Sequence, residues 1–353
     1  MESPIQITNL PTYNTNHHGK SFLNCPGEPQ PPEMVFKFFF GPSDVSADNC
    51  APFRQITPEE FSREPGIRFW WIGHATCLFQ LGDIFILTDP VFTTYASPVA
   101  GIAKRAVPPA CTIDQLPKIS YCIISHNHYD HLDHPSIMDL YKRFPDIIFF
   151  VGLRMSELIG KWGIPQKSIV EFDWRQKAEL LPPNSTNSNP IILTCMPAHH
   201  YSNRKGYDGG KYLWISFLIE YSNILIYFPG DTSIGPHFSE VSTVAGRPID
   251  FVSMPVGPTE PFQIMKAVHV DPEQARDMSE ILRAKVVVPI HWGVFPLGKL
   301  PDISDIEAIK IAFHNINKDD ILKRVKVGGS LEYNQSSNQF EVKEGSLDDF
   351  LIV

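Results

Sequence analysis

The chain has 353 residues, of which 43% are hydrophobic and 20% charged, and its formal net charge at pH 7 is -9. These values predict a globular protein of one large domain or two. The acidic balance argues against a protein that coats nucleic acid. No run of about 18 apolar residues occurs, so no transmembrane helix is expected.

The start of the chain and its cysteines bear on location. The opening MESPIQITNL has neither the basic nor the apolar segment of a signal peptide. The six cysteines are scattered and form no CxxC pair, which favours free thiols in a reducing compartment. A cytoplasmic location is therefore expected.

Residues 1–66 are rich in Pro and Asn and show little periodicity. We expect an extended arm that packs on the domain behind it. The aromatic segment VFKFFF at 35–40 has two interpretations. It anchors the arm on the core, or it faces a membrane, since exposed aromatic clusters mark interaction sites.

Strand patterns begin at residue 67, where we place the start of a domain that extends to 333. IRFWWIG, CLFQL and IFILTD (67–89) predict strands, the last two joined by a tight turn at Gly82-Asp83. Two apolar runs on either side of Ser222-Asn223 predict a second hairpin. Further short strands are expected at 121–125, 147–152, 191–195 and 285–290.

Helices are predicted between these strands. Pro135 opens a helix capped by Asp133 or His134, and Asp271-Pro272 opens another. The apolar face expected for the second helix comprises Ala275, Met278, Ile281 and Leu282. Residues 304–316 are a third helix, and 334–353 are expected to be a polar, peripheral tail. Two strand-rich halves, each followed by helices, predict two mixed sheets covered by helices.

Four predicted strands each lead directly into His or Asp residues. The run 121–125 precedes HNHYDH, and the run 191–195 precedes His199-His200. Asp231 follows the second hairpin, and His291 follows the run 285–290. Ligand sites of sheet proteins lie beyond the carboxyl ends of strands, so we expect these side chains to meet.

Imidazole and carboxylate are the ligands that catalytic Zn²⁺ takes. Enough of them are present for two ions, and Asp231 is a candidate to bridge them. Two adjacent ions activate water for a phosphoryl or acyl displacement. The candidate ligands are His126, His128, Asp130, His131, one of His199 and His200, Asp231 and His291.

Two neighbouring residues have two interpretations each. Asp89 is either a carboxylate that orients a ligating histidine or a turn cap before Pro90. His74 is either a hydrogen-bonded core histidine or a residue that lines the site.

These motifs resemble the metallo-β-lactamase superfamily, for which HxHxDH is typical. WIGHATCLFQLGDIFILTDPVF (71–92), ISHNHYDHLD (124–133), GDTS (230–233), HVDPEQA (269–275) and IHWGVF (290–295) resemble, in particular, the N-acylphosphatidylethanolamine-hydrolysing phospholipase D family. The resemblance implies an α/β (α+β) fold, a four-layer αββα sandwich, with a site for two Zn²⁺ ions at one edge. Segments 96–106 and 202–211 depart from the family pattern, which leaves headgroup and acyl-chain preference open.

The resemblance also implies residue roles. His126, His128 and His200 would hold one ion, and Asp130, His131 and His291 the other, with Asp231 between them. His200 is preferred to His199 because the family's ligand precedes an aromatic residue, here Tyr201. Asp130, His131, Asp231 and His291 would form the catalytic set, and Tyr129 and His269 would line the substrate site.

The implied reaction is hydrolysis of N-acylphosphatidylethanolamine to N-acylethanolamine and phosphatidic acid, with a phospholipid as partner and peripheral contact with a membrane. The alternatives are a lactonase or small-ester hydrolase of the same superfamily, a nuclease, and a non-catalytic metal-binding scaffold. The same ligands also accept iron or manganese. A homodimer is kept as an open alternative.

Overall fold

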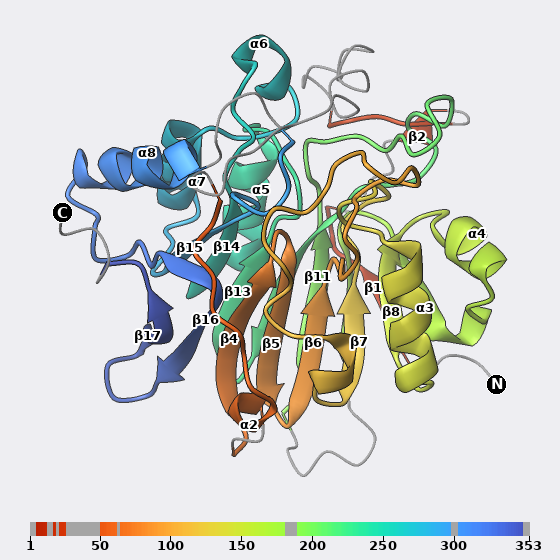
Figure 1. Cartoon of the computed structure of the whole chain (residues 1–353), viewed down its shortest axis with the longest axis horizontal. Coiled ribbons are helices and arrows are strands. Elements are labelled where there is room, and N and C mark those ends of the chain that lie inside the picture. Colours follow the sequence, from red (N-terminus) through yellow and green to blue (C-terminus); the bar gives the residue numbers. More distant parts are fainter. Residues whose placement is uncertain are drawn as a thin grey trace.

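The computed structural model describes residues 5–12, 17–18, 21–25, 50–61, 64–180, 189–297 and 303–348. The segment 35–40 lies outside these ranges. In the described part, two large mixed sheets face each other across an apolar core, and helices lie at the outer sides (Figure 1). The expected sandwich fold is confirmed.

The first sheet has seven strands in the order β1-β10-β11-β12-β13-β14-β15. Its strands β13, β14 and β15 run parallel. The bounds are β1 Ile7–Asn9, β10 Gln176–Leu180, β11 Ile191–Met196, β12 Ser216–Tyr221, β13 Ile224–Phe228, β14 Phe251–Pro255 and β15 Val287–Ile290.

The second sheet has eight strands in the order β17-β16-β4-β5-β6-β7-β8-β9, and β6 to β9 run parallel. The bounds are β4 Gly66–Gly73, β5 Thr76–Gly82, β6 Ile84–Thr88, β7 Ile119–Ile123, β8 Ile148–Gly152, β9 Ile169–Phe172, β16 Val325–Asn334 and β17 Gln339–Ser346. A small separate hairpin is formed by β2 (His17–His18) and β3 (Ser21–Phe22).

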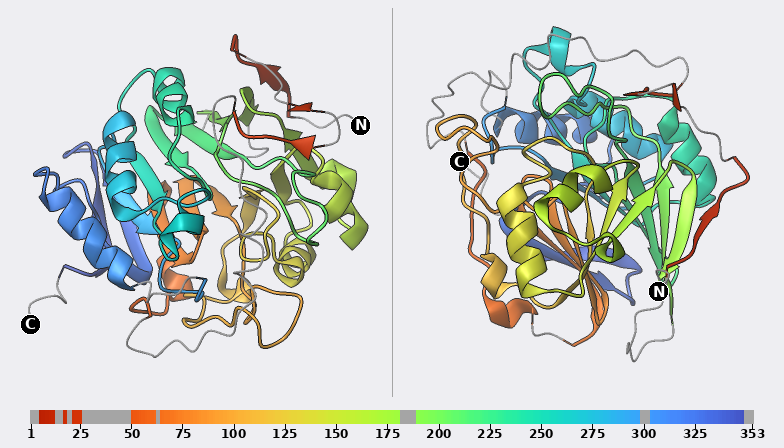
Figure 2. Two further views of the ribbon diagram at one scale, coloured as in Figure 1. Left: turned by 90° about the horizontal axis from the view of Figure 1, so that it is seen from above. Right: turned by 90° about the vertical axis from the view of Figure 1, so that its right-hand side faces the viewer.

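The helices lie on opposite sides of the sandwich (Figure 2). Helices α5 (His237–Ala245), α7 (Pro272–Ile281) and α8 (Ile303–His314) gather beside β13 to β15. Helices α3 (His134–Arg143) and α4 (Ser156–Ile159) lie beside β7 to β9. Short helices α2 (Pro58–Phe61) and α6 (Phe262–Met265) complete the set in the described residues. None of the described helices is long and apolar enough to cross a bilayer.

Both predicted hairpin turns occur, because each has the backbone that its residues favour. Gly82, between β5 and β6, has a φ of 68°. Ser222 and Asn223, between β12 and β13, have φ values of 49° and 66°. Two successive positive φ values define a type I′ turn, whose twist matches that of the strands.

The predicted helix starts also occur. Asp133, rather than His134, caps α3, since its side chain accepts a hydrogen bond from the backbone N–H of Ser136. Asp271 caps α7 in the same way through Gln274.

Three sequence-based expectations were wrong. Ile281 is 38% exposed and leaves the apolar face of α7, which ends at this residue. The strand expected at 285–290 starts only at Val287. The expected peripheral tail contains β17, which pairs with β16 and buries Phe340 in the core.

The described part of the N-terminal segment packs on the domain, as expected for an arm. Strand β1 pairs with β10 and extends the first sheet. Phe22, Cys25, Ala51 and Ile56 are buried in the main core. Five of the six cysteines are buried, and Cys50 is half-buried.

Candidate metal centre

The candidate ligands converge at one edge of the sandwich. Five strands, β6, β7, β11, β13 and β15, end there, and each is followed by a loop that carries polar residues. The seven residues brought together are His126, His128, Asp130, His131, His200, Asp231 and His291.

Three imidazoles form a first group. Nδ1 of His128 lies 2.9 Å from Nε2 of His126 and 3.2 Å from Nε2 of His200. His126 and His200 are buried, and His128 is half-buried and lines the pocket above them. The separations suit three ligands that face one ion.

A second group contains His131, His291 and Asp130. The Nε2 atoms of His131 and His291 lie 3.2 Å apart, and Asp130 Oδ2 lies 3.5 Å from the first and 3.8 Å from the second. Asp231 joins the two groups. Its Oδ2 is 3.1 Å from His131 Nε2 and 4.0 Å from His126 Nε2, and its Oδ1 is 3.1 Å from His291 Nε2.

Hydrogen bonds at the far side of the rings fix their tautomers. The Nδ1 of His200 lies 2.9 Å from the carbonyl oxygen of Val268, and that of His291 lies 3.1 Å from the carbonyl oxygen of Gly257. A carbonyl only accepts hydrogen bonds, so each Nδ1 carries the proton. Each neutral ring therefore presents the lone pair of Nε2 to the site.

Asp89 fixes the tautomers of His131 and, through Ser125, of His126. Its Oδ2 accepts hydrogen bonds from Nδ1 of His131 at 2.7 Å and from Oγ of Ser125 at 2.6 Å. Ser125 Oγ in turn accepts from Nδ1 of His126 at 2.9 Å. Asp89 thus contacts one histidine of each group, directly or through Ser125, as expected for a carboxylate that orients ligands. The geometry does not match a turn cap.

The structure also places His74 and His199, each of which had two interpretations in the sequence. His74 lies in the site: its Nε2 is 3.0 Å from Asp130 Oδ2, and its ring centroid is 3.9 Å from that of His291. His199 does not join the cluster, and its backbone N–H donates to Oγ1 of Thr232.

The electrostatics of both groups suit a cation. Burial lowers the pKa of His128 to about 4 and that of His200 to about 3. These rings are neutral at pH 7 and can act as ligands. For His291, burial alone would lower the pKa, but Asp231 and Asp130 outweigh it and raise the value to about 9. Two Nε2 lone pairs 3.2 Å apart repel each other unless a proton or a metal ion lies near them. The residues present therefore fit metal ions.

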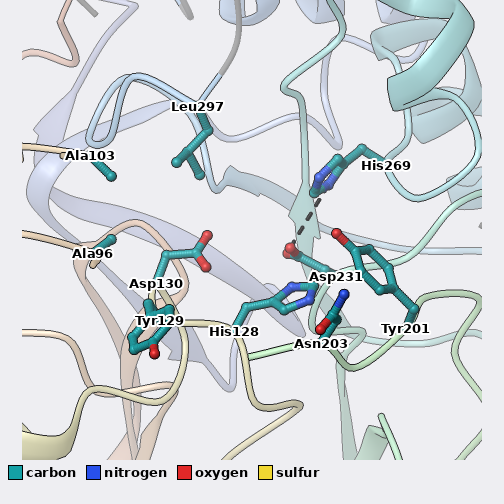
Figure 3. Close-up of a pocket in the computed structure, with 10 residues that line it drawn as sticks. All are labelled: Ala96, Ala103, His128, Tyr129, Asp130, Tyr201, Asn203, Asp231, His269 and Leu297. Atoms are coloured by element: carbon teal, nitrogen blue, oxygen red, sulfur yellow. Dashed lines mark ion pairs between the residues drawn. The ribbon is translucent and has the colours of Figure 1, made fainter. Parts of the chain in front are cut away.

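A pocket opens over this cluster (Figure 3). Tyr129 and His269 both line it. His269 Nδ1 lies 3.8 Å from Asp231 Oδ2, and the Arg204 guanidinium lies 3.8 Å from the centroid of the Tyr129 ring. The full lining is Ala96, Ala103, His128, Tyr129, Asp130, Tyr201, Asn203, Asp231, His269 and Leu297.

Sequence reasoning missed three features of this pocket. Tyr201 served only as a marker for His200, yet its ring packs against His128 and His200, at centroid distances of 4.6 and 5.0 Å. Burial and the charges of Asp130 and Asp231 raise its pKa, so the phenol stays protonated. Asn203 and Leu297 carry no motif, and only the folded loops bring them here.

Comparisons with known proteins agree with this geometry. The model of the Beta-lactamase superfamily domain matches residues 85–292. An N-acyl-phosphatidylethanolamine-hydrolyzing phospholipase D of Caenorhabditis elegans is 32% identical over 297 residues, which are 79% of this chain and 80% of that protein.

Two solved structures share the fold. A metallo hydrolase from the archaeon Ignicoccus hospitalis has a TM-score of 0.56 at 19% identity, over 76% of this chain and 98% of that one. A diiron β-hydroxylase from Streptomyces venezuelae has a TM-score of 0.53 at 17% identity, over 76% of this chain and 54% of that one.

Proposed function

Because the chain belongs to the metallo-β-lactamase superfamily of metal-dependent hydrolases, we propose that it is a phosphodiesterase of the phospholipase D type. Its substrate would be N-acylphosphatidylethanolamine, and its products N-acylethanolamine and phosphatidic acid. The observation that carries the proposal is Asp231, whose carboxylate faces both groups of imidazoles beneath an open pocket. The worm relative, named for this reaction, supports the substrate class.

The residues that would hold two metal ions fall into the two groups described above. His126, His128 and His200 would hold one ion, and Asp130, His131 and His291 the other, with Asp231 shared. When bound, such ions activate water and stabilise negative charge on a phosphoryl group. We propose Zn²⁺, which the imidazole-rich ligand set suits.

The reaction breaks the bond between phosphorus and the ethanolamine oxygen. Water supplies the hydroxyl group that phosphorus gains and the proton that the leaving oxygen takes. Asp89 and the carbonyl groups of Gly257 and Val268 keep the imidazoles oriented throughout. In this proposal Tyr129 and His269 contact the substrate, since both line the pocket beside Asp231.

The pocket mouth suggests how a lipid would arrive. Three large side chains on segments near pocket residues in the chain are well exposed: Val99 at 53%, Phe262 at 41% and Tyr207 at 81%. Val99 and Tyr207 lie on loops that also supply pocket residues. Phe262 lies on α6, whose Ile264 belongs to the small apolar cluster that Tyr201 joins. We propose that this rim makes peripheral contact with a membrane, and that the protein is cytoplasmic.

The test measures metal content and turnover together. Purified protein loaded with zinc is expected to hold about two ions per chain and to release N-acylethanolamine from a defined N-acylphosphatidylethanolamine in vesicles. Chelation should abolish the release, and returning zinc should restore it. Two ions with turnover of a lactone but not of the lipid would reject the phospholipase and favour a lactonase.

The variant His291→Ala tests the ligand assignment. It removes one ligand of the second group, so we expect loss of about one metal ion per chain and of most turnover. His314→Ala is the matched control, because His314 is exposed on α8 and belongs to none of the candidate metal-binding groups. Full metal content and full turnover in His291→Ala would refute the assignment.

A further inference from the structure

The pocket has two unlike walls (Figure 3). One wall is apolar and consists of Ala96, Ala103 and Leu297. The opposite wall carries Tyr201 and Asn203, and the candidate ligands His128, Asp130 and Asp231 lie between the walls. A substrate over the metals therefore meets hydrocarbon on one side and polar side chains on the other.

Tyr201 is held rigidly in the polar wall. Its ring packs against His128 and His200 and against the apolar cluster of Ile264 and Val268. Its hydroxyl points toward the space beside Asp231 and His269 (Figure 3). Among the described residues, none forms a hydrogen bond with this hydroxyl, so its proton is available to a ligand.

Asn203 is oriented by its own loop. Its Oδ1 accepts a hydrogen bond from the backbone N–H of Gly206 at 2.9 Å. This assigns the amide, because a backbone N–H pairs only with the oxygen. The Nδ2 group is then the end left to donate, and no described residue accepts from it. Ser202, between the two, is buried, and its hydroxyl accepts from Tyr212 N–H instead.

We propose that the Tyr201 hydroxyl and the Asn203 amide are a pair of donors that binds a non-bridging phosphoryl oxygen of the substrate. This inference rests on the proposed phosphodiesterase function. Asp130 and Asp231 repel an anionic group, so an anion at this site needs donors as well as metal ions. The side chains of Ala96, Ala103 and Leu297 offer no hydrogen bond, so the pair on the other wall would hold the phosphoryl group in one orientation.

Two variants each remove one donor and little else. Tyr201→Phe deletes only the hydroxyl. Asn203→Asp keeps an oxygen for the Gly206 N–H but replaces the donor with a negative charge. Each is expected to lower kcat/KM for the phosphodiester by about 10- to 100-fold, with unchanged metal content. Tyr141→Phe is the matched control, because Tyr141 lies on α3 outside the pocket lining and its change should leave kcat/KM unchanged.

A second readout does not require turnover. Inorganic phosphate binding to zinc-loaded protein, measured by calorimetry, should weaken by about 10-fold in Tyr201→Phe and by more in Asn203→Asp, whose carboxylate repels the anion. Unchanged phosphate affinity in both variants would overturn the proposal. So would a loss of metal in Tyr201→Phe that accounts for its loss of activity, since the ring would then act only through His128 and His200.

The two proposals can fail separately. If the unmodified protein hydrolyses no phosphodiester, the proposed function is wrong. Phosphate binding to the unmodified protein and to both variants would still decide whether Tyr201 and Asn203 form an anion-binding pair.

Discussion

Asp89 is the residue on which the orientation of both ligand groups depends. It receives hydrogen bonds from His131 and from Ser125, which in turn holds His126. Its backbone follows β6 directly, so the sheet itself sets the position of the carboxylate. A single side chain thus couples the two candidate metal sites.

We expect Asp89→Asn to weaken the binding of both ions by about 10- to 100-fold each. The carboxylate also accepts a hydrogen bond from the backbone N–H of Ser125 at 2.7 Å, and an amide with one oxygen cannot accept all three. Competition with a chromogenic chelator measures the two affinities. Asp139→Asn, on the exposed face of α3, is the control. If the variant bound only one of the two ions more weakly, Ser125 would not transmit the effect of the substitution to His126.

At the scale of residues, the ligand types and their positions after strands could be predicted, because strand ends are visible in the hydrophobic pattern. The residues that orient these ligands and that line the pocket beside them could not be predicted. Asp89 had two interpretations until its distance to His131 was known. Tyr201 and Asn203 line the pocket because a loop without regular structure turns both side chains the same way. No periodicity encodes that turn.

At the scale of elements, α8 bears on the second ligand group through a neighbouring loop. Asp305 on α8 accepts a hydrogen bond from Thr259 Oγ1 at 2.9 Å. It lies so close to Gly257 that a β-carbon there would meet its Oδ2 at 2.4 Å. The carbonyl of Gly257 holds His291. Helix α8 therefore contacts the loop at Gly257, and this loop in turn contacts the candidate ligand His291.

The buried carboxyl group of Asp305 makes the free energy of unfolding depend on pH. Burial raises its pKa from 3.8 to about 6. The folded state binds this proton more tightly than the unfolded state, so the stabilisation is complete below about pH 4 and is lost as pH rises through about 6. We expect Asp305→Asn to raise the free energy of unfolding above pH 6 by up to about 3 kcal/mol, and to change it little at pH 4.

Urea unfolding of both proteins at pH 4.5 and 7.5 checks this, since the difference between them cancels the other titrating groups. An equal effect at both pH values would contradict it. Glu280→Gln, which removes an exposed carboxylate on α7, is the control for the loss of one negative charge.

Element prediction succeeded where local chemistry decides and failed where packing decides. The turns at Gly82 and Ser222-Asn223 need positive φ values, which these residues favour. The prediction for Ile281 was wrong because the buried face of α7 passes through Ala275, Met278 and Leu282, and Ile281 lies beside this face. Strand β17 was missed because one of its faces is exposed, which leaves a mostly polar sequence.

At the scale of the whole molecule, β17 contributes to the core between the sheets. Phe340 is 1% exposed, and its ring centroid lies 4.9 Å from that of Phe251 on β14 of the other sheet. Phe251 in turn contacts Phe69 on β4. The edge strand β17 of the second sheet is therefore packed against β14, the strand next to the edge of the first sheet.

We expect Phe340→Ala to lower the free energy of unfolding by about 3–5 kcal/mol, because it leaves a cavity between the sheets. Phe340→Leu should cost markedly less. Chemical denaturation measures both, and metal content should be unchanged in the folded protein because the candidate ligands lie at the edge of the sandwich. A cost below about 1 kcal/mol would show that β17 is peripheral after all.

Strand β16 pairs with β4, and Trp70 faces Ser330 in that register, some 260 residues further along the chain. During synthesis β4 therefore emerges long before the strand that covers its edge. Until residues 325–334 leave the ribosome, a strand with buried Phe69, Trp70 and Trp71 presents unpaired backbone to other chains. We therefore expect a chain that stalls before β16 is made to aggregate more readily than the complete protein.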